Sequence, residues 1–215
     1  MQRITLYAMV VCLMLAGTVS AEQEAPRVLL LGDDVYYHVN RGLGKHLKDR
    51  ARVTWKKPGD TSSALEDLDE MLGEEKWDVI HFNFGFADLH YKDPSTKEVR
   101  AMSKDAGGVR VTAPQQYEKN LEELVKRLKA TGAKLVWAST TPILNPQPVE
   151  SLYDIGSEIE YNAIAARVMA RHGVPINDMH SFVLEQIDPE RPPGILDFRG
   201  IDLVTPVAKA IQAKL

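Results

Sequence analysis

Residues 27–43 read RVLLLGDDVYYHVNRGL, and this stretch decides the fold class of the chain. The apolar run from Val28 to Leu31 ends at Gly32, two carboxylates follow, and a helical pattern of apolar residues begins at Val35. A strand, a glycine turn and a helix in this order are typical of α/β domains, in which ligands bind at the carboxyl edge of the sheet. We therefore expect any functional site to lie around Asp33 and Asp34.

The rest of the chain alternates between short apolar runs and amphipathic stretches. This pattern predicts strands at residues 27–31, 51–56, 77–84, 133–139 and 174–177, and helices at residues 35–49, 61–72, 115–131, 157–172, 178–186 and 203–213. Such alternation predicts an α/β fold with about five parallel strands and helices on both faces, a three-layer α/β/α sandwich. Gly42 and Gly44 are expected to interrupt the first helix, and Thr61 or Ser62 to cap the second.

Residues 87–114 are the least regular stretch and have no clear period. A loop of this length inside a compact domain is often functional, and its place after the third predicted strand brings it near the expected site. We interpret it as a candidate lid. The alternative is a surface excursion without a role at the site.

The first residues have the pattern of an export signal. A basic start at Arg3 precedes a mostly apolar core, and the small residues 19–21 fit a cleavage site, so residues 1–21 are predicted to be a signal peptide and residues 22–215 one domain. An uncleaved membrane anchor is the alternative, but the apolar run is shorter than the roughly 20 residues that a span needs. We expect a periplasmic or extracellular protein that is not stably anchored in a membrane after cleavage.

Composition excludes several classes of function. The only cysteine, Cys12, lies in the predicted signal peptide, so the mature chain has no disulfide, thiol nucleophile or cysteine-based zinc site. The net charge is −4 and no Lys/Arg cluster stands out, which argues against nucleic-acid binding. The spacing of the histidines fits no metal motif, so neither a metal nor another cofactor is predicted.

His81 and Asn83 lie within a predicted strand and are expected to be hydrogen-bonded structural groups. We expect His46 and His172 at the surface and His180 to pack.

Several blocks together resemble one family. They read WDVIHFNFG at 77–85, YEKNL at 117–121, TGAKLVWA at 131–138, TTP at 140–142, YN at 161–162 and VPIND at 174–178. With the first stretch, they are similar to the SGNH (GDSL-type) hydrolases, in particular to a secreted bacterial branch. The resemblance implies a flavodoxin-like SGNH-hydrolase fold. It also implies ester hydrolysis by a serine nucleophile, with a histidine base oriented by an aspartate and an oxyanion held by a serine amide, a glycine amide and an asparagine side chain.

The site positions that the resemblance implies have changed in this chain. The family positions, some of them with altered residues, are Asp33 and Asp34 in the first block, Gly59 in the second, Gly85, Ala87 and Asp88 in the third, and Asp197 in the last. Asp34 stands where the nucleophilic serine is expected, and Ala87 has no side-chain donor for an oxyanion. No histidine follows His180, and Asp197 is the best candidate for the position of the catalytic histidine. No positive partner for Asp34 is evident, and crowding by Asp33 would raise its pKa rather than activate it.

Three hypotheses follow. The first is a catalytically degenerate protein that binds a small molecule, a glycan or an envelope polymer in the old cleft. The second is rewired chemistry, in which Asp34, Asp88 and Asp197 form a carboxylate cluster with His38 or His90, for a hard cation or for glycoside cleavage. The third is an esterase acting on acylated carbohydrate, with Ser62, Ser63 or Ser139 as the nucleophile. The sequence leaves the ligand and the oligomeric state open.

Overall fold

The computed structural model describes residues 24–48, 50–96, 99–145, 152–194 and 197–215, so the predicted signal peptide lies outside the described residues. Its main sheet has five parallel strands in the order β2-β1-β3-β6-β7. The strands are β1 (Arg27–Leu31), β2 (Arg52–Lys56), β3 (Val79–Phe82), β6 (Lys134–Ala138) and β7 (Ile176–Asn177). As predicted, the sheet is parallel and the apolar third strand is central, with all four of its residues buried.

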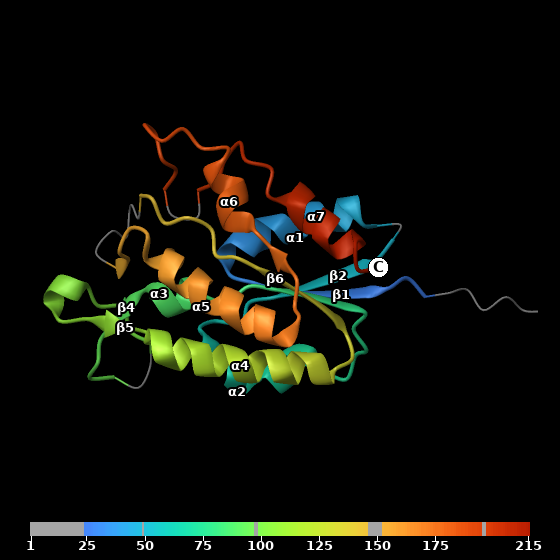
Figure 1. Ribbon diagram of the computed structural model, residues 1–215, viewed down its shortest axis with the longest axis horizontal. Helices are drawn as coiled ribbons and strands as arrows, with labels where there is room; N and C mark the ends of the chain where they lie inside the picture. The colour runs from blue at the N-terminus through green and yellow to red at the C-terminus, as the bar shows by residue number, and fades with distance from the viewer. Residues whose placement is uncertain (1–23, 49, 97–98, 146–151, 195–196) are drawn as a thin grey trace, which may run out of the picture.

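Helices cover both faces of this sheet, so the predicted three-layer α/β/α sandwich is confirmed (Figure 1). One face carries α1 (Asp34–His46) and α7 (Val204–Gln212), and the other carries α2 (Thr61–Leu72), α4 (Pro114–Ala130) and α5 (Ser157–His172). The short helix α6 (Met179–Leu184) follows β7. Among the described residues, no helix combines the length and the apolar character that crossing a membrane requires.

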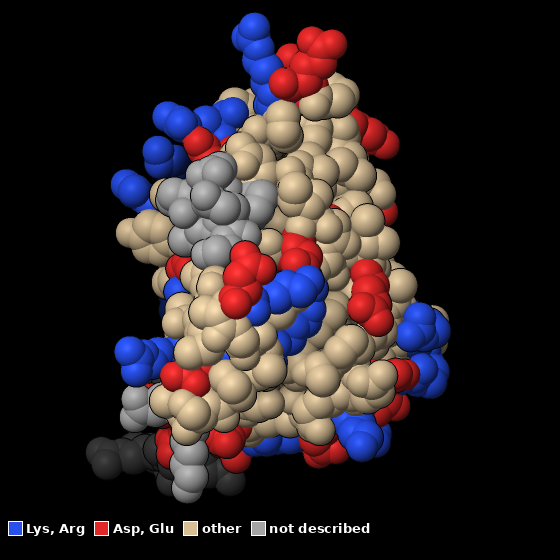
Figure 2. All heavy atoms as spheres, turned by 90° about the vertical axis from the view of Figure 1, so that its left-hand side faces the viewer, with Lys and Arg blue, Asp and Glu red and all other residues tan. Residues whose placement is uncertain are grey.

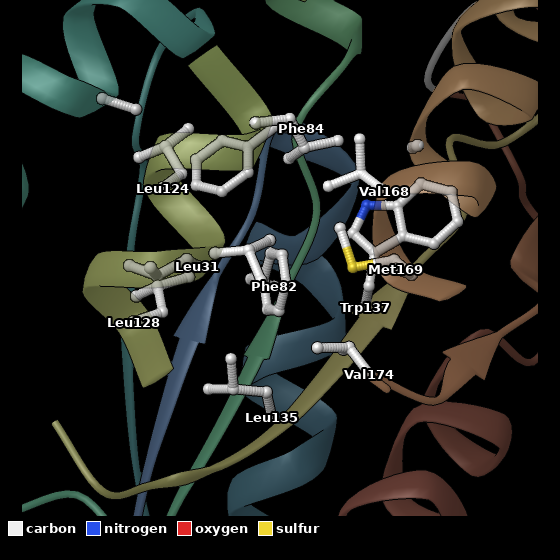
Figure 3. Close-up of a cluster of buried hydrophobic side chains, with 14 of the residues drawn as sticks. Leu31, Phe82, Phe84, Leu124, Leu128, Leu135, Trp137, Val168, Met169 and Val174 are labelled. Carbon is white, nitrogen blue, oxygen red and sulfur yellow. The ribbon is translucent and has the colours of Figure 1, made fainter. Parts of the chain in front are cut away.

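Each face of the sheet has its own apolar core. Side chains alternate between the faces of a strand, so Leu29 and Leu31 face the α2–α4–α5 side whereas Val28 and Leu30 face the α1–α7 side. Figure 3 shows the larger core, in which Phe82 and Trp137 from the sheet pack among side chains of α4 and α5. Both side chains are almost fully buried. Packing of this kind on both faces leaves the strand ends as the exposed edge of the sheet.

Two predicted helix features are corrected. Helix α1 runs through Gly42 and Gly44 without a break. At Gly42 a Cβ atom would lie 2.5 Å from Val204 Cγ2, so the missing side chain lets α7 approach α1. The cap of α2 is Asp60 rather than Thr61 or Ser62, because its carboxylate accepts the amides of Ser62 and Ser63 at 2.9 and 3.2 Å.

Other boundaries also differ from the prediction. Strand β3 and strand β7 are shorter than expected, because only Val79–Phe82 and Ile176–Asn177 make the ladder contacts. The predicted bounds of β1, α2 and α5 are confirmed, and the ends of the other elements shift by one to three residues, as is usual for ends that fray. The predicted end of the first helix, residue 49, lies outside the described residues.

The irregular stretch after β3 contains short elements of its own. These are α3 (Phe86–Leu89), the antiparallel pair β4 (Tyr91–Lys92) and β5 (Val109–Arg110), and the 3₁₀ helix η1 (Lys104–Ala106). The pair and α3 extend beyond the carboxyl ends of the main strands (Figure 1). The stretch that reads as an irregular loop therefore contains short regular elements, whereas its role as a lid stays a prediction.

Replacing Asp60 by alanine is expected to lower the free energy of unfolding by about 1–2 kcal/mol, because the first turn of α2 loses its side-chain acceptor. Urea unfolding followed by circular dichroism measures the change. Glu66→Ala, an exposed position on the same helix, is the control and is expected to change stability by less than about 0.5 kcal/mol. Equal effects of the two substitutions would contradict the assignment of Asp60 as the cap.

Candidate functional site

Asp33 is the N-cap of α1 and Asp34 is the first residue of this helix, but the two carboxylates have different surroundings. The Asp33 carboxylate accepts the Val35 amide at 2.9 Å. Burial raises the pKa of the Asp33 carboxyl to about 7; the hydrogen bond from Val35 opposes this shift, and the charge of Asp34 adds to it. Asp33 therefore holds a proton for part of the time near neutral pH while it stabilises the start of the helix.

Asp34 is half-exposed and forms an ion pair with Lys57. The ammonium nitrogen Nζ lies 2.7 Å from Oδ1 and 2.8 Å from Oδ2 of Asp34, so it contacts both carboxylate oxygens. The expectation that Asp34 has no positive partner is therefore wrong. Lys57 follows directly after β2, and β2 is paired with β1 in parallel, so the ends of the two strands lie side by side. That adjacency was the signal that sequence reasoning missed.

Asp88, unlike Asp34, is fully buried. Its Oδ1 accepts the amide of Thr61 at 2.9 Å and the hydroxyl of Thr61 at 2.6 Å. Burial raises the pKa of Asp88 to about 7, although the hydrogen bonds from Thr61 oppose the shift. Asn120 of α4 also donates to the Thr61 hydroxyl, at 3.1 Å. Asp88 thus joins the turn after β3 to the start of α2.

The remaining third-block positions shape the backbone of the turn after β3. Gly85 has a φ of 156°, and a Cβ atom there would lie 2.4 Å from the Thr140 hydroxyl, so only glycine fits. Ala87 is half-buried and contributes no side-chain donor. Gly59, in the turn between β2 and α2, has a φ of 72° and supplies the left-handed conformation that this turn needs.

Asp197 lies on the far side of a surface cavity from α1. Its carboxylate binds Arg199 through Nε at 2.8 Å and Nη2 at 2.7 Å, and this guanidinium lowers the pKa of Asp197. The cavity has a volume of about 610 Å³. It is lined on one side by Val35, His38 and Val39 of α1, and on the other by residues 197–199 and 201–204. Asp197 is therefore next to the first block, although it pairs with arginine.

The three carboxylates of the rewired-chemistry hypothesis have different partners. Asp34 binds Lys57, Asp88 binds Thr61, and Asp197 binds Arg199. In the described part of the chain, no group of three or more histidine, cysteine, aspartate or glutamate residues is arranged to hold a metal ion. The cluster that this hypothesis needs is not formed by the described side chains. Figure 2 views the side where β4 and β5 lie, and acidic and basic side chains are interspersed there.

The proposed serine nucleophiles have structural partners. Ser63 donates its hydroxyl to Asp60 at 2.8 Å, and Ser62 accepts Asn120 at 3.0 Å. Ser139 donates to Asp178 at 3.0 Å and accepts the backbone amide of His180 at 2.9 Å. None of these hydroxyls has a hydrogen bond to a histidine ring among the described residues, so none has an adjacent general base.

His81, inside the sheet, and His180, at the start of α6, are each close to a polar side chain of another element. His81 is fully buried and its Nε2 lies 3.2 Å from Asn177 Nδ2, as expected of a structural group. Burial lowers the pKa of His81 to about 3, so the ring is neutral. His180 pairs through Nε2 with the buried carboxylate of Glu158 at 3.1 Å, a partner that the packing prediction missed. Asn83 donates to the carbonyl of Ala138 at 2.9 Å.

The surface histidines also have distinct surroundings. His46 is exposed as predicted, whereas His172 is half-buried and its Nε2 lies 3.0 Å from Glu122 Oε1. His90 is half-buried beside the ring of Tyr153, at a centroid distance of 6.1 Å, and burial lowers its pKa. His38 is exposed on α1 and also lines the cavity. His38 and His90 thus remain near the strand ends without a hydrogen bond to Asp34.

The stretch that we interpret as a candidate lid is held by one acidic residue from a distant segment. Asp154, just before α5, accepts the Tyr91 hydroxyl at 2.5 Å and Arg110 Nη2 at 2.7 Å. Lys104 Nζ lies 3.2 Å from its other oxygen, and the Lys104 and Arg110 charges lie over the Tyr91 ring. These contacts fix the β4–β5 pair against the start of α5 in the structure.

Comparisons with known proteins agree with this architecture. The model of the GDSL-like lipase/acylhydrolase family matches residues 20–197, so the chain belongs to this family. No curated protein matches the sequence.

Solved structures share the fold at low identity. A lipase/acylhydrolase from Enterococcus faecalis superposes with a TM-score of 0.64 at 14% identity, covering 88% of this chain and 97% of that chain. LAE5, an α/β hydrolase enzyme from the metagenome of Lake Arreo, Spain, gives a TM-score of 0.63 at 17% identity, covering 88% and 95%. The acetyl xylan esterase AlAXEase gives 0.60 at 14% identity, covering 87% and 96%. The predicted SGNH-hydrolase fold is thereby confirmed.

Replacing Asp88 by asparagine tests the buried carboxyl through the pH dependence of stability. The pKa of Asp88 is about 7 in the folded protein and about 3.9 when unfolded, so its contribution is present below about pH 4 and lost as pH rises to about 7. Asparagine keeps an acceptor for Thr61 and cannot ionise. We expect the variant to gain stability relative to the wild type between those pH values, by up to about 4 kcal/mol.

Urea unfolding of both proteins at several pH values measures this difference. Asp67→Asn, an exposed change on α2, is the control and is expected to follow the wild type throughout. A difference between Asp88→Asn and the wild type that stays constant, or shrinks as the pH rises, would contradict the assignment. Asp33 titrates in the same range, but it is present in all three proteins and therefore cancels in the comparison.

Proposed function

We propose that this chain is an exported, catalytically inactive member of its family that binds a small molecule, a glycan or an envelope polymer. One observation carries the proposal: the residue at the family's nucleophile position, Asp34, is engaged by Lys57 through both carboxylate oxygens. The assignment of the chain to the hydrolase family rests on the family match and does not depend on this ion pair. Loss of catalysis, export and ligand binding are the parts that need experiments.

Chemistry at Asp34 argues against ester cleavage. Attack by a carboxylate on an ester would form an anhydride, which is less stable than the ester it replaces. The ammonium of Lys57 also holds the negative charge of Asp34 and lowers its nucleophilicity. A serine-type mechanism needs instead a hydroxyl and an adjacent base, and position 34 supplies no hydroxyl.

The supporting groups of the family mechanism are also missing. No histidine follows His180 in the sequence, and the ring of His180 is hydrogen-bonded to Glu158. The polar donor position for an oxyanion is Ala87, which leaves only backbone amides. Losing nucleophile, base and donor together removes a rate enhancement that no single remaining group restores.

Export is proposed from residues 1–21, which have the charge and apolar pattern of a signal peptide. Outside the cytoplasm, glycans and cell-envelope polymers are available ligands. The cavity beside α1, with a volume of about 610 Å³, offers space for such a ligand next to the first block.

The purified chain without residues 1–21 is expected to hydrolyse p-nitrophenyl acetate and butyrate at no more than about twice the rate of buffer. Asp34→Ala is expected to leave that rate unchanged, because Asp34 performs no chemistry. Asp69→Ala is the matched control, since Asp69 is another surface carboxylate paired with a basic side chain, Arg127. Release of p-nitrophenol, followed by absorbance, is the measurement.

A double variant tests whether the cleft can still support catalysis when the family's catalytic groups are restored. Asp34→Ser combined with Asp197→His restores a hydroxyl and an imidazole at the two family positions, and weak turnover would show that only the catalytic groups have been lost. Robust turnover by the wild-type chain would overturn the proposal. In that case, loss of activity in Asp34→Ala would identify a carboxylate mechanism, whereas its retention would place the nucleophile elsewhere.

A further inference from the structure

Three aromatic side chains lie together on the surface beside the Asp34–Lys57 pair. The Tyr37 ring meets the Trp55 ring edge-on, with centroids 5.4 Å apart and an interplanar angle of 65°. The His38 ring meets Tyr37 from the neighbouring position, at 5.3 Å and 75°. We call Trp55, Tyr37 and His38 the aromatic strip. It joins two elements, β2 and α1, that meet at the carboxyl edge of the sheet.

The strip lies on the side of α1 that does not face the core. Val35, Tyr36, Val39 and Leu43 form the buried side of this helix. Tyr37 is 46% exposed, and His38 is exposed as well. The helix therefore does not need these rings for its own packing. Exposed rings that contact one another form a larger apolar surface than scattered ones, and such surfaces often mark ligand sites.

The strip is held in place before any ligand arrives. Trp55 donates its indole Nε1 to the carbonyl of Gly32 at 3.2 Å, and its ring packs partly against the core between the sheet and α1. The Tyr37 ring rests edge-on against this fixed indole. Fixed side chains lose little conformational entropy on binding, so their contacts with a ligand are not offset by that cost.

Polar groups flank the strip on one side. Lys57 lies two residues after Trp55 along the strand direction, and Asp34 lies one helical turn before Tyr37 and His38, so both are neighbours of the strip. The side chains of Lys57 and Asp34 are 50% and 52% exposed. An ammonium has three donors and a carboxylate about four acceptor sites, so each keeps capacity for further hydrogen bonds. Their charges offset one another.

We propose that the aromatic strip is a binding site for a neutral oligosaccharide chain. The C–H faces of a pyranose ring carry slight positive charge and pack against the electron-rich faces of aromatic rings. The ring hydroxyls need donors and acceptors at the margin, which Lys57, Asp34 and the polar tips of Tyr37 and His38 supply. A polyanion is disfavoured because the lysine at this site is already neutralised by Asp34.

The cavity beside α1 extends this surface. His38 both contacts Tyr37 and lines the cavity of about 610 Å³, so the strip and the cavity are continuous through this residue. Phe198 and Arg199 line the opposite wall and offer another ring and further donors. A chain of several sugar units therefore has a path from Trp55 across Tyr37 and His38 into the cavity.

This inference rests on the proposed function in taking a glycan as the ligand, but it does not depend on the loss of catalysis. It locates the glycan on α1 and β2, beside the first-block position Asp34 and next to the cavity that Asp197 helps to line. An active enzyme could use the same strip to hold a polymer beside its cleft. The binding test below therefore succeeds or fails separately from the ester assay.

Tryptophan fluorescence gives a direct readout of the strip. The chain has three tryptophans, and Trp77 and Trp137 are 5% and 1% exposed, so Trp55 is the half-exposed one that a surface ligand reaches. We expect titration with chitohexaose or xylohexaose to give a saturable change with a Kd in the millimolar range or below. Tyr37→Ala is expected to weaken binding at least tenfold, because it removes the exposed ring.

Ile159→Ala is the matched control, since Ile159 is an exposed apolar residue on α5, on the opposite face of the sheet. We expect it to leave the Kd within twofold, and thermal melts of both variants establish that they are folded. Three outcomes would overturn the inference: no saturable change with either sugar, equal affinity of Tyr37→Ala and wild type, or saturation by decanoate in place of sugars. Esterase activity with an unoccupied strip would overturn both proposals, whereas inactivity without sugar binding would overturn only this one.

Discussion

The carboxyl group of Asp88 is buried where the turn after β3 meets the start of α2, and its hydrogen bonds to Thr61 hold those two segments together. The Thr61 hydroxyl also accepts Asn120, so α4 is tied to the same point. Because α2 begins there, the short turn between β2 and α2 has to end at Asp60. Lys57 lies at the other end of that turn, where it contacts Asp34.

Burying Asp88 has a cost that the rest of the fold offsets. Its raised pKa means that the folded state favours the protonated carboxyl, and stability falls as pH rises through the range in which the proton is lost. The amide and the hydroxyl of Thr61 both donate to Oδ1 of Asp88, whether this carboxyl is protonated or ionised. The apolar cores on both sheet faces supply the main favourable term, and Asp88 supplies the geometry of the edge on which the site lies.

The sequence predicted what depends on local pattern. Periodicity and glycine punctuation were sufficient for the parallel sheet, its central third strand and the helices on both faces. The resemblance added the family. Features that depend on partners distant in sequence were missed. Thr61 looks like a cap, yet its hydroxyl is hydrogen-bonded to Asp88, so Asp60 caps α2 instead. The β4–β5 pair is fixed by Asp154, which lies 44 residues beyond Arg110, and no local pattern indicates that contact.

The family positions of this chain have been redistributed among structural tasks. Asp33 caps a helix, Asp34 binds a lysine, and Asp197 binds an arginine. Both ion pairs are solvent-exposed, so they orient these carboxylates without adding much to stability. The rings of Tyr37 and His38, in contrast, are exposed on α1, and Trp55 is only partly buried against the core. Since function belongs to the site rather than to the fold, the surface beside α1 is where we expect a ligand to be recognised.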